Sequence, residues 1–425
     1  MVIINKSDAT GGAAVVSRRL LEALRGEGVD ARMLVCEKLT DSPYVELAAN
    51  PKLIKWKFLL ERLKIYISTG FNKTNLFKID TGEEGLPLWK HPLVREADAI
   101  LINWVNQGML SLDGLEEILK LNKPVVWTMH DMWCMTGICH HAGKCNHFHS
   151  KCGDCPLLEK YAAHDDLSHK VWSRKNKIYN NSGLNKKLAF VAVSNWLKDK
   201  AFESALLKDH KIFTIPNAFK ISQNSPQQRE VKKTPIRILF GAARLDDPIK
   251  GIDTLRETSK ILKREFPEIA SHLEIAMFGN VKNPDSMEGF ELPVIKLGVL
   301  HGEEEVKKAY ENSDIVVSAS SYETLPGTLV EAQAYGCIPV SFNQGGQTDI
   351  ILNGITGFIA EYDDNLAVRA NKLANEIVKA CSIINNPEQR QIFISRMNRN
   401  VAEKFSYSRV AREYISLIQS LEEVK

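Results

Sequence analysis

The chain has 425 residues, of which 44% are hydrophobic and 25% charged. This is the composition of a folded globular protein, and the length exceeds what one ordinary core needs, so we expect two large domains. The 55 Lys and Arg residues against 52 Asp and Glu residues leave a formal charge of +3, too little to indicate a nucleic-acid partner.

The N-terminal residues do not resemble a targeting segment. The sequence MVIINKSD lacks the charged start and the long apolar stretch of a signal peptide. No run in the chain approaches the roughly 18 apolar residues that span a bilayer. We therefore expect a cytoplasmic protein.

Short apolar, β-rich runs alternate with helical patterns along most of the chain, which is typical of an α/β protein with parallel sheets covered by helices. In the first half, strands are predicted at 32–36, 99–103, 124–129, 190–193 and 212–215. A polar stretch at 217–235 is interpreted as a linker. Strands are predicted again at 236–242, 273–278, 294–296, 315–318 and 338–342, and helices at 363–381, 387–405 and 408–421.

This order of elements predicts the domain organisation. We expect a first domain at 1–220, a second domain at 221–405, and a terminal segment at 406–425 that packs back on the first domain. Both large domains would be α/β units with a parallel sheet.

The segment 50–90 is the least regular part of the first half and allows two interpretations. It carries apolar residues at roughly helical spacing, namely Trp56, Phe58, Leu59, Leu60, Leu63, Ile65 and Tyr66. They form either a core-facing helix or a basic, aromatic patch that meets an acceptor or a membrane surface. The sequence alone leaves both open.

Paired glycines follow the first apolar run. Gly11 and Gly12 stand between that run and the amphipathic pattern at 15–24. Glycines at a strand-to-helix turn let the backbone approach a ligand closely, and a helix N-terminus offers free N–H groups to a phosphate. A plain tight turn also explains two glycines, and the spacing is not that of a dinucleotide-binding motif.

Five cysteines lie within 22 positions, interleaved with four histidines: Cys134, Cys139, Cys145, Cys152 and Cys155. The Cys-x2-Cys spacing at the end, with two of the earlier cysteines, would supply four thiolates for tetrahedral zinc. The predicted ligands are Cys139, Cys145, Cys152 and Cys155, which leaves Cys134 over. Disulfides and an iron–sulfur cluster are the alternatives.

Two cations follow the first predicted strand of the second half. Arg244 and Lys250 lie at the carboxyl end of this strand, where open parallel sheets bind ligands. A guanidinium and an ammonium together would neutralise a diphosphate leaving group without a metal ion. Solvated loop cations are the alternative.

Two carboxylates eight positions apart follow the predicted strand 315–318. Glu323 precedes a helix opened by Pro326 and Gly327, and Glu331 lies one turn inside it. The helix N-terminus, with Thr324, Leu325, Gly327, Thr328 and Leu329, would present backbone N–H groups to a ligand.

With these motifs in register, the sequence resembles the retaining glycosyltransferases of family 4. The resemblance rests on Glu323-x7-Glu331, the pair Arg244 and Lys250, Gly11-Gly12, Pro216-Asn217 and Thr356-Gly357-Phe358. It spans nearly the whole chain. It implies the GT-B fold, in which two Rossmann-like domains with parallel sheets face each other across an interdomain cleft.

The resemblance also implies roles for individual residues. Arg244 and Lys250 would bind the donor diphosphate, Glu331 the ribose, and Glu323 would lie near the sugar. His130 matches a position near the transferred sugar, Asn217 would border the donor, and Gly11-Gly12 would border the phosphate and the acceptor from the other domain. Ser194 matches a further family position. In a subset of bacterial relatives, similar insertions carry four cysteines at the places found within 134–155.

The implied reaction is transfer of a sugar from a UDP- or GDP-linked donor to a saccharide or lipid-linked acceptor, with retention of configuration and no catalytic metal. The resemblance favours surface polysaccharide assembly and peripheral contact with the inner face of the cell membrane. Two alternatives remain, a sugar-nucleotide epimerase of the same architecture and a non-catalytic nucleotide-sugar binding protein.

Overall fold

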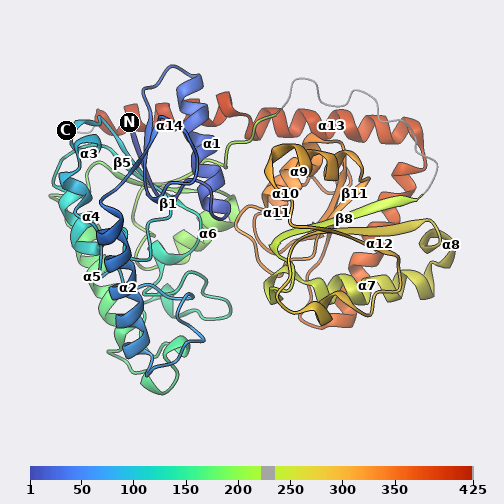
Figure 1. Ribbon diagram of the computed structural model, residues 1–425, viewed down its shortest axis with the longest axis horizontal. Coiled ribbons are helices and arrows are strands. Elements are labelled where there is room, and N and C mark those ends of the chain that lie inside the picture. The colour runs from blue at the N-terminus through green and yellow to red at the C-terminus, as the bar shows by residue number, and fades with distance from the viewer. Residues whose placement is uncertain (222–234, 424–425) are drawn as a thin grey trace. The chain divides into compact units, whose positions relative to one another are not determined.

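The computed structural model describes residues 1–221 and 235–423 and divides them into two compact units (Figure 1). Unit 1 comprises Met1–Ala218 and the C-terminal segment from Tyr407, and unit 2 comprises Phe219–Ser406. The boundary therefore lies two residues before the expected position. Most of the expected linker at 217–235 lies outside the described residues.

Unit 1 is built on a sheet of seven parallel strands in the order β3-β2-β1-β4-β5-β6-β7. The strands are β1 Val2–Ser7, β2 Arg32–Glu37, β3 Val45–Leu47, β4 Ile100–Ile102, β5 Val125–Met129, β6 Leu188–Ala192 and β7 Ile212–Thr214. Every residue of β4, β5 and β6 is buried. Their continuous apolar runs suit strands that helices cover on both faces.

The longer helices of unit 1 are α1 Gly12–Gly26, α2 Pro51–Ser68, α4 Leu112–Leu119, α5 Leu167–Tyr179, α6 Asn195–Glu203 and α14 Tyr407–Glu422, with the short α3 Pro92–Glu96. The terminal helix α14 packs on α1. Its Tyr414 hydroxyl lies 2.9 Å from the Thr128 hydroxyl of β5, and its Arg412 bonds Glu27. The C-terminus of the chain thus completes the core of unit 1.

Unit 2 contains six parallel strands in the order β10-β9-β8-β11-β12-β13. They are β8 Ile236–Arg244, β9 Leu273–Asn280, β10 Val294–Gly298, β11 Ile315–Ser318, β12 Ile338–Phe342 and β13 Phe358–Ala360. The helices are α7 Ile252–Glu265, α8 Pro267–Ala270, α9 Gly302–Glu311, α10 Gly327–Ala334, α11 Gln347–Ile350, α12 Leu366–Ile384 and α13 Pro387–Phe405. The α/β prediction is confirmed, with two parallel sheets.

The strand order reverses once in each sheet. In unit 1 the chain moves outward from β1 to β3 and then returns to place β4 on the other side of β1; β8 and β11 mark the same reversal in unit 2. The loops at the carboxyl ends of such strands diverge and leave a crevice for a ligand. These two reversal points define where a site is expected.

Helix α2 differs from the core-facing interpretation of residues 50–90. Its buried residues are Glu61, Arg62 and Ile65, whereas the apolar Trp56, Leu59 and Leu63 are exposed. The core-facing interpretation is therefore wrong for these three side chains. Over the described ranges, neither this helix nor any other has the length and hydropathy that a membrane span requires.

Candidate functional site

The loops that follow β8 and β11 are fastened to each other. The Ser321 amide donates a hydrogen bond to the Ile249 carbonyl at 2.9 Å. Gly251, with φ of 74°, lies so close to the Ala319 carbonyl that a Cβ there would overlap it. This contact and the left-handed backbone favour glycine at this position. These two contacts between the loops, called the latch below, fix the position of Lys250, the residue before Gly251.

Lys250 and Glu323 meet across this pair of loops. The Lys250 ammonium lies 2.5 Å from Oε1 of Glu323, and the Ser320 hydroxyl donates to the same oxygen at 3.0 Å. Both side chains remain partly exposed, at 29% and 21%. The structure thus brings together two predicted residues that are 73 positions apart in the sequence.

Arg244, at the end of β8, lies beside two carboxylates of its own loop. Its Nε is 3.5 Å from Asp246 Oδ1, and a terminal nitrogen is 3.7 Å from Asp247 Oδ2. Asp246 is itself held by the backbone N–H groups of Lys282 and Asn283. Each predicted phosphate-binding cation therefore has a carboxylate neighbour, which the sequence reasoning did not anticipate.

Glu331 projects from α10 toward an aromatic pair. The Tyr310 hydroxyl donates to Oε2 of Glu331 at 2.9 Å, and the Tyr310 ring stacks on Tyr335 with centroids 5.4 Å apart. A carboxylate held in this way keeps acceptor capacity for a further donor such as a hydroxyl. Tyr310 is a site residue that the motif search missed, since a lone tyrosine in α9 carries no spacing signal.

The first turn of α10 has no side-chain cap. Thr324 and Leu325 precede the helix, and Gly327, Thr328 and Leu329 form its first turn. Beside it, the Gly346 amide of the loop after β12 donates to the Glu323 carbonyl at 2.9 Å. The helix N-terminus and Glu323 therefore lie in one connected loop region at the reversal point of unit 2.

In unit 1, Gly11 and Gly12 begin α1 at the other reversal point. Gly11 has φ of 89°, and α1 likewise has no side-chain cap. A Cβ at either glycine would meet open space. Packing therefore does not require glycine here, which is consistent with backbone kept accessible for a ligand.

His130 follows β5 and is bonded to the loop after β4. Its Nε2 lies 2.8 Å from Asn103 Oδ1. Burial lowers the pKa of His130 to about 4, although the nearby Asp131 opposes this shift. A small cavity lined by His130, Asn103 and Thr128 also contains Asn217. The structure therefore places Asn217 with His130, within unit 1.

Asp131 organises the neighbouring side chains. It accepts hydrogen bonds from the Trp104 indole at 2.8 Å and pairs with His140 at 2.7 Å. Burial opposes its ionisation, but the charge and hydrogen bond of His140 hold the pKa of Asp131 low, at about 2. Trp104 and His140 were not predicted, because their proximity depends on the fold. Ser194 is a helix cap, accepting from the Leu197 amide.

The four predicted metal-ligating cysteines line one small cavity: Cys139, Cys145, Cys152 and Cys155. Burial raises the pKa of Cys139 to about 12 and that of Cys152 to about 11. The Gly137 amide points at the Cys152 sulfur, 3.2 Å away. Within residues 1–221 and 235–423, no group of three or more His, Cys, Asp or Glu side chains is already arranged to hold a metal ion.

Part of the chain is similar to a family of glycosyltransferases. The model of the family described as glycosyl transferases group 1 matches residues 236–380. A relative named for colanic acid biosynthesis, the glycosyl transferase WcaC of Escherichia coli (strain K12), is 26% identical over 267 residues, which cover 59% of each chain. The chain therefore spans less than two thirds of this relative.

Solved structures also match over nearly the whole chain, including the following two. A glycosyltransferase from Rickettsia africae ESF-5 superposes with a TM-score of 0.61 at 16% identity, covering 100% of this chain and 99% of the other. The Anabaena protein HepE, solved in complex with UDP-glucose, superposes with a TM-score of 0.56 at 14% identity, covering 99% of both. At these identities the match supports the fold, which is GT-B.

Proposed function

Because residues 236–380 of this chain belong to the glycosyl transferases group 1 family, we propose that the protein is a retaining glycosyltransferase of surface polysaccharide biosynthesis. It moves a sugar from a nucleotide-diphosphate sugar to an acceptor hydroxyl. The observation that carries this proposal is the contact of Lys250 with Glu323 across two latched loops at the sheet reversal of unit 2.

Unit 2 would bind the donor. Arg244 and Lys250 would contact the diphosphate, which would replace part of their contact with the neighbouring carboxylates. The N-terminus of α10 would add backbone N–H groups that bind the phosphates. Glu331, oriented by Tyr310, would accept hydrogen bonds from the ribose diol. A UDP-sugar is the first donor to test, since HepE was solved with UDP-glucose.

The proposed reaction is a displacement on one face of the sugar. The bond from the anomeric carbon to the β-phosphate oxygen breaks and its electron pair stays on the phosphate. The acceptor oxygen bonds to the same carbon from the same side, and its proton passes to the departing phosphate. The main demand on the protein is stabilisation of the phosphate charge, which the two cations supply.

Unit 1 would supply the acceptor side. Gly11 and Gly12 offer accessible backbone, and His130 with its partner Asn103 would contact the sugar as a neutral imidazole. The depressed pKa of His130 means that the ring donates or accepts one hydrogen bond without carrying charge at neutral pH.

Hydrolysis of a panel of UDP- and GDP-sugars tests the proposal. We expect turnover of at least one donor, with the released sugar keeping its anomeric configuration, and a strong loss of turnover in Arg244→Ala and Lys250→Ala. An exchange of configuration within the intact donor would instead indicate an epimerase. Binding of donors without any turnover would indicate the non-catalytic alternative.

We also propose that Cys139, Cys145, Cys152 and Cys155 hold a structural zinc ion. Four thiols around one cavity match the donor set of such sites, and an amide hydrogen bond to a ligating sulfur, as from Gly137, is a common supporting contact. The thiols would lose their protons on binding. Elemental analysis should find about one zinc per chain, and a fully active, metal-free preparation with free thiols would exclude the site.

We further propose that the protein makes a peripheral contact with a membrane surface. Transfer to a lipid-linked acceptor takes place at such a surface, and the resemblance to family 4 implies both.

A further inference from the structure

Helix α2 carries an apolar stripe on its outer side. Leu53, Trp56, Leu59, Leu63 and Ile67 follow one another at spacings of three or four residues and are all exposed, with Trp56 at 58%. Residues at this spacing share one face of a helix. Beyond the helix end, Phe71 extends the stripe, with 65% of its surface exposed.

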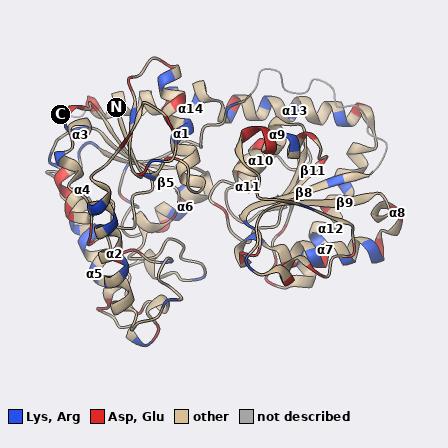
Figure 2. Ribbon diagram, viewed as in Figure 1, with Lys and Arg blue, Asp and Glu red and all other residues tan. Residues whose placement is uncertain are grey.

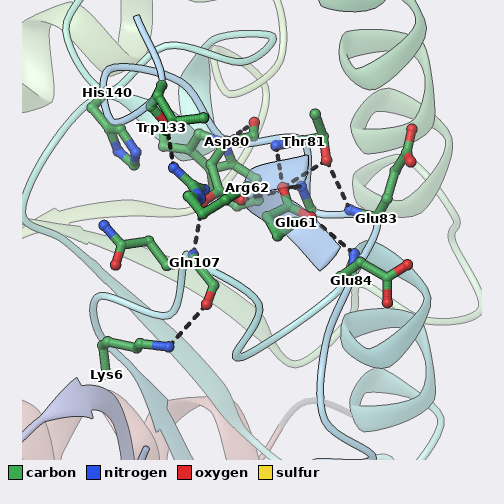
Figure 3. A network of polar contacts seen from close by, with 12 residues as sticks. Lys6, Glu61, Arg62, Asp80, Thr81, Glu83, Glu84, Gln107, Trp133 and His140 are labelled. Carbon is green, nitrogen blue, oxygen red and sulfur yellow. Dashed lines mark hydrogen bonds and ion pairs between the residues drawn. The ribbon is translucent and has the colours of Figure 1, made fainter. Parts of the chain in front are cut away.

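A buried polar network on the inner side fixes the rotation of α2 (Figure 3). The Glu61 carboxylate accepts hydrogen bonds from the amide and hydroxyl of Thr81 at 2.8 and 2.6 Å, and from the Gly82 and Glu84 amides. Arg62 pairs with Asp80 at 2.7 Å. These two residues point inward next to each other, so the stripe must face outward.

The network also connects α2 to the candidate site. Asp80 accepts from the Gln107 amide at 2.7 Å, and the Trp133 indole donates to the Asp80 carbonyl at 2.8 Å. Lys6, on β1, donates to the Gln107 carbonyl at 2.9 Å. These contacts therefore hold the stripe in place relative to β1 and the loops after β4 and β5.

The excess positive charge of the chain lies in the same segment. Residues 51–84 contain seven Lys and Arg against four Asp and Glu, which leaves 48 of each in the rest of the chain. The carboxylates have partners within the segment: Glu84 contacts Lys57 and Lys64, Glu83 contacts Lys64, and Asp80 contacts Arg62. Lys52 and Lys55 in α2, and Lys73 and Lys78 beyond its end, are exposed, and Figure 2 shows the Lys and Arg positions along α2 in blue.

We propose that the outer face of α2, continued by Phe71, docks on an anionic lipid surface. An apolar stripe flanked by lysines matches the two layers of such a surface, because the apolar side chains enter the acyl boundary while the ammonium groups contact lipid phosphates. This surface would make the membrane contact proposed above, and only its biological role rests on the proposed function. It would hold the acceptor side of unit 1 at the membrane.

Flotation of the full chain with lipid vesicles tests this docking. The vesicles contain phosphatidylcholine either alone or with phosphatidylglycerol as the anionic component. We expect the wild-type chain to float with the anionic vesicles, and less so as salt is raised. The double variants Trp56→Ser with Leu63→Ser, and Lys52→Gln with Lys55→Gln, should each lower the partition coefficient about tenfold or more.

A matched control removes apolar surface elsewhere. Ile355 and Ile392 of unit 2 are also exposed, and their replacement by serine should leave the partition coefficient within about twofold of the wild type. Wild-type protein that fails to float, or α2 variants that float as well as wild type, would overturn the proposal. So would a wild-type dimer that the α2 variants convert to monomers, since the stripe would then bind a second copy.

The two proposals fail separately. UDP-glucose hydrolysis in vesicle-free buffer should be the same in the wild type and the α2 variants, because none of the altered side chains touches the donor residues. Loss of flotation with intact hydrolysis supports the docking surface. An absence of hydrolysis with every donor in all forms would count against the proposed function and leave the lipid result standing.

Discussion

Replacing Lys250 by alanine separates its role in catalysis from its role in stability. The ammonium contacts Glu323 at 2.5 Å, but both side chains are partly exposed, and a pair of this kind contributes about 0–1 kcal/mol to folding. If the ammonium stabilises the departing phosphate, its loss raises the free energy of the transition state by about 2.7–4 kcal/mol, which lowers turnover about 100- to 1000-fold. The catalytic loss should thus exceed the loss of stability several times over.

The assay compares donor turnover with thermal unfolding in the same preparations. For a unit of this size, 1 kcal/mol shifts Tm by about 2–4 °C, so Lys250→Ala should change Tm by no more than that. Lys260→Ala, which removes another partly exposed ion pair of unit 2, is the control and should leave both quantities nearly unchanged. A fall in turnover of less than about fivefold, or one that only follows the loss of stability, would refute the reasoning.

Three further predictions concern stability and pH. The folded pKa of His130, about 4, lies below its unfolded value, so the contribution of His130 to folding stability is complete above about pH 6.5 and is lost as pH falls toward 4. The free energy of unfolding in urea should therefore fall by on the order of 1 kcal/mol by about pH 5.5, and His130→Gln should reduce this pH dependence. Gly251→Ala should destabilise unit 2 by about 2 kcal/mol or more, because the Cβ meets the Ala319 carbonyl and φ is positive; an unchanged Tm would contradict the latch. Arg390→Ala leaves the buried Asp314 carboxylate, now 2.6 Å from the guanidinium, without that partner, and should cost about 3–5 kcal/mol in urea unfolding. Adding Asp314→Asn should restore part of this loss.

The positions of the strands, and of the residues at their ends, are the features best predicted from the local sequence. All ten strands predicted from apolar runs are present within a few residues. Central strands such as β5 and β6 are buried along their whole length and must therefore be apolar throughout. The polar residues directly after these runs, such as Arg244 and Glu323, therefore lie at the carboxyl edge of a sheet. β3 and β13 were not predicted.

Partners across the fold could not be predicted in the same way. The contact of Lys250 with Glu323 joins loops after neighbouring strands, and the sequence gives no distance between such loops. The carboxylates beside Arg244, the pairing of Asp131 with His140, and the position of Asn217 beside His130 likewise depend on which strands are adjacent.

Helix α2 shows most clearly where prediction from the sequence alone ends. The sequence by itself determined that Trp56 and Leu63 share one face, since helical periodicity relates residues three or four apart. Only the tertiary structure decided that this face points outward, because Thr81 and Asp80 supply the partners that make burial of Glu61 and Arg62 favourable. A charged side chain is buried only where a distant segment satisfies it, and periodicity carries no information about that segment.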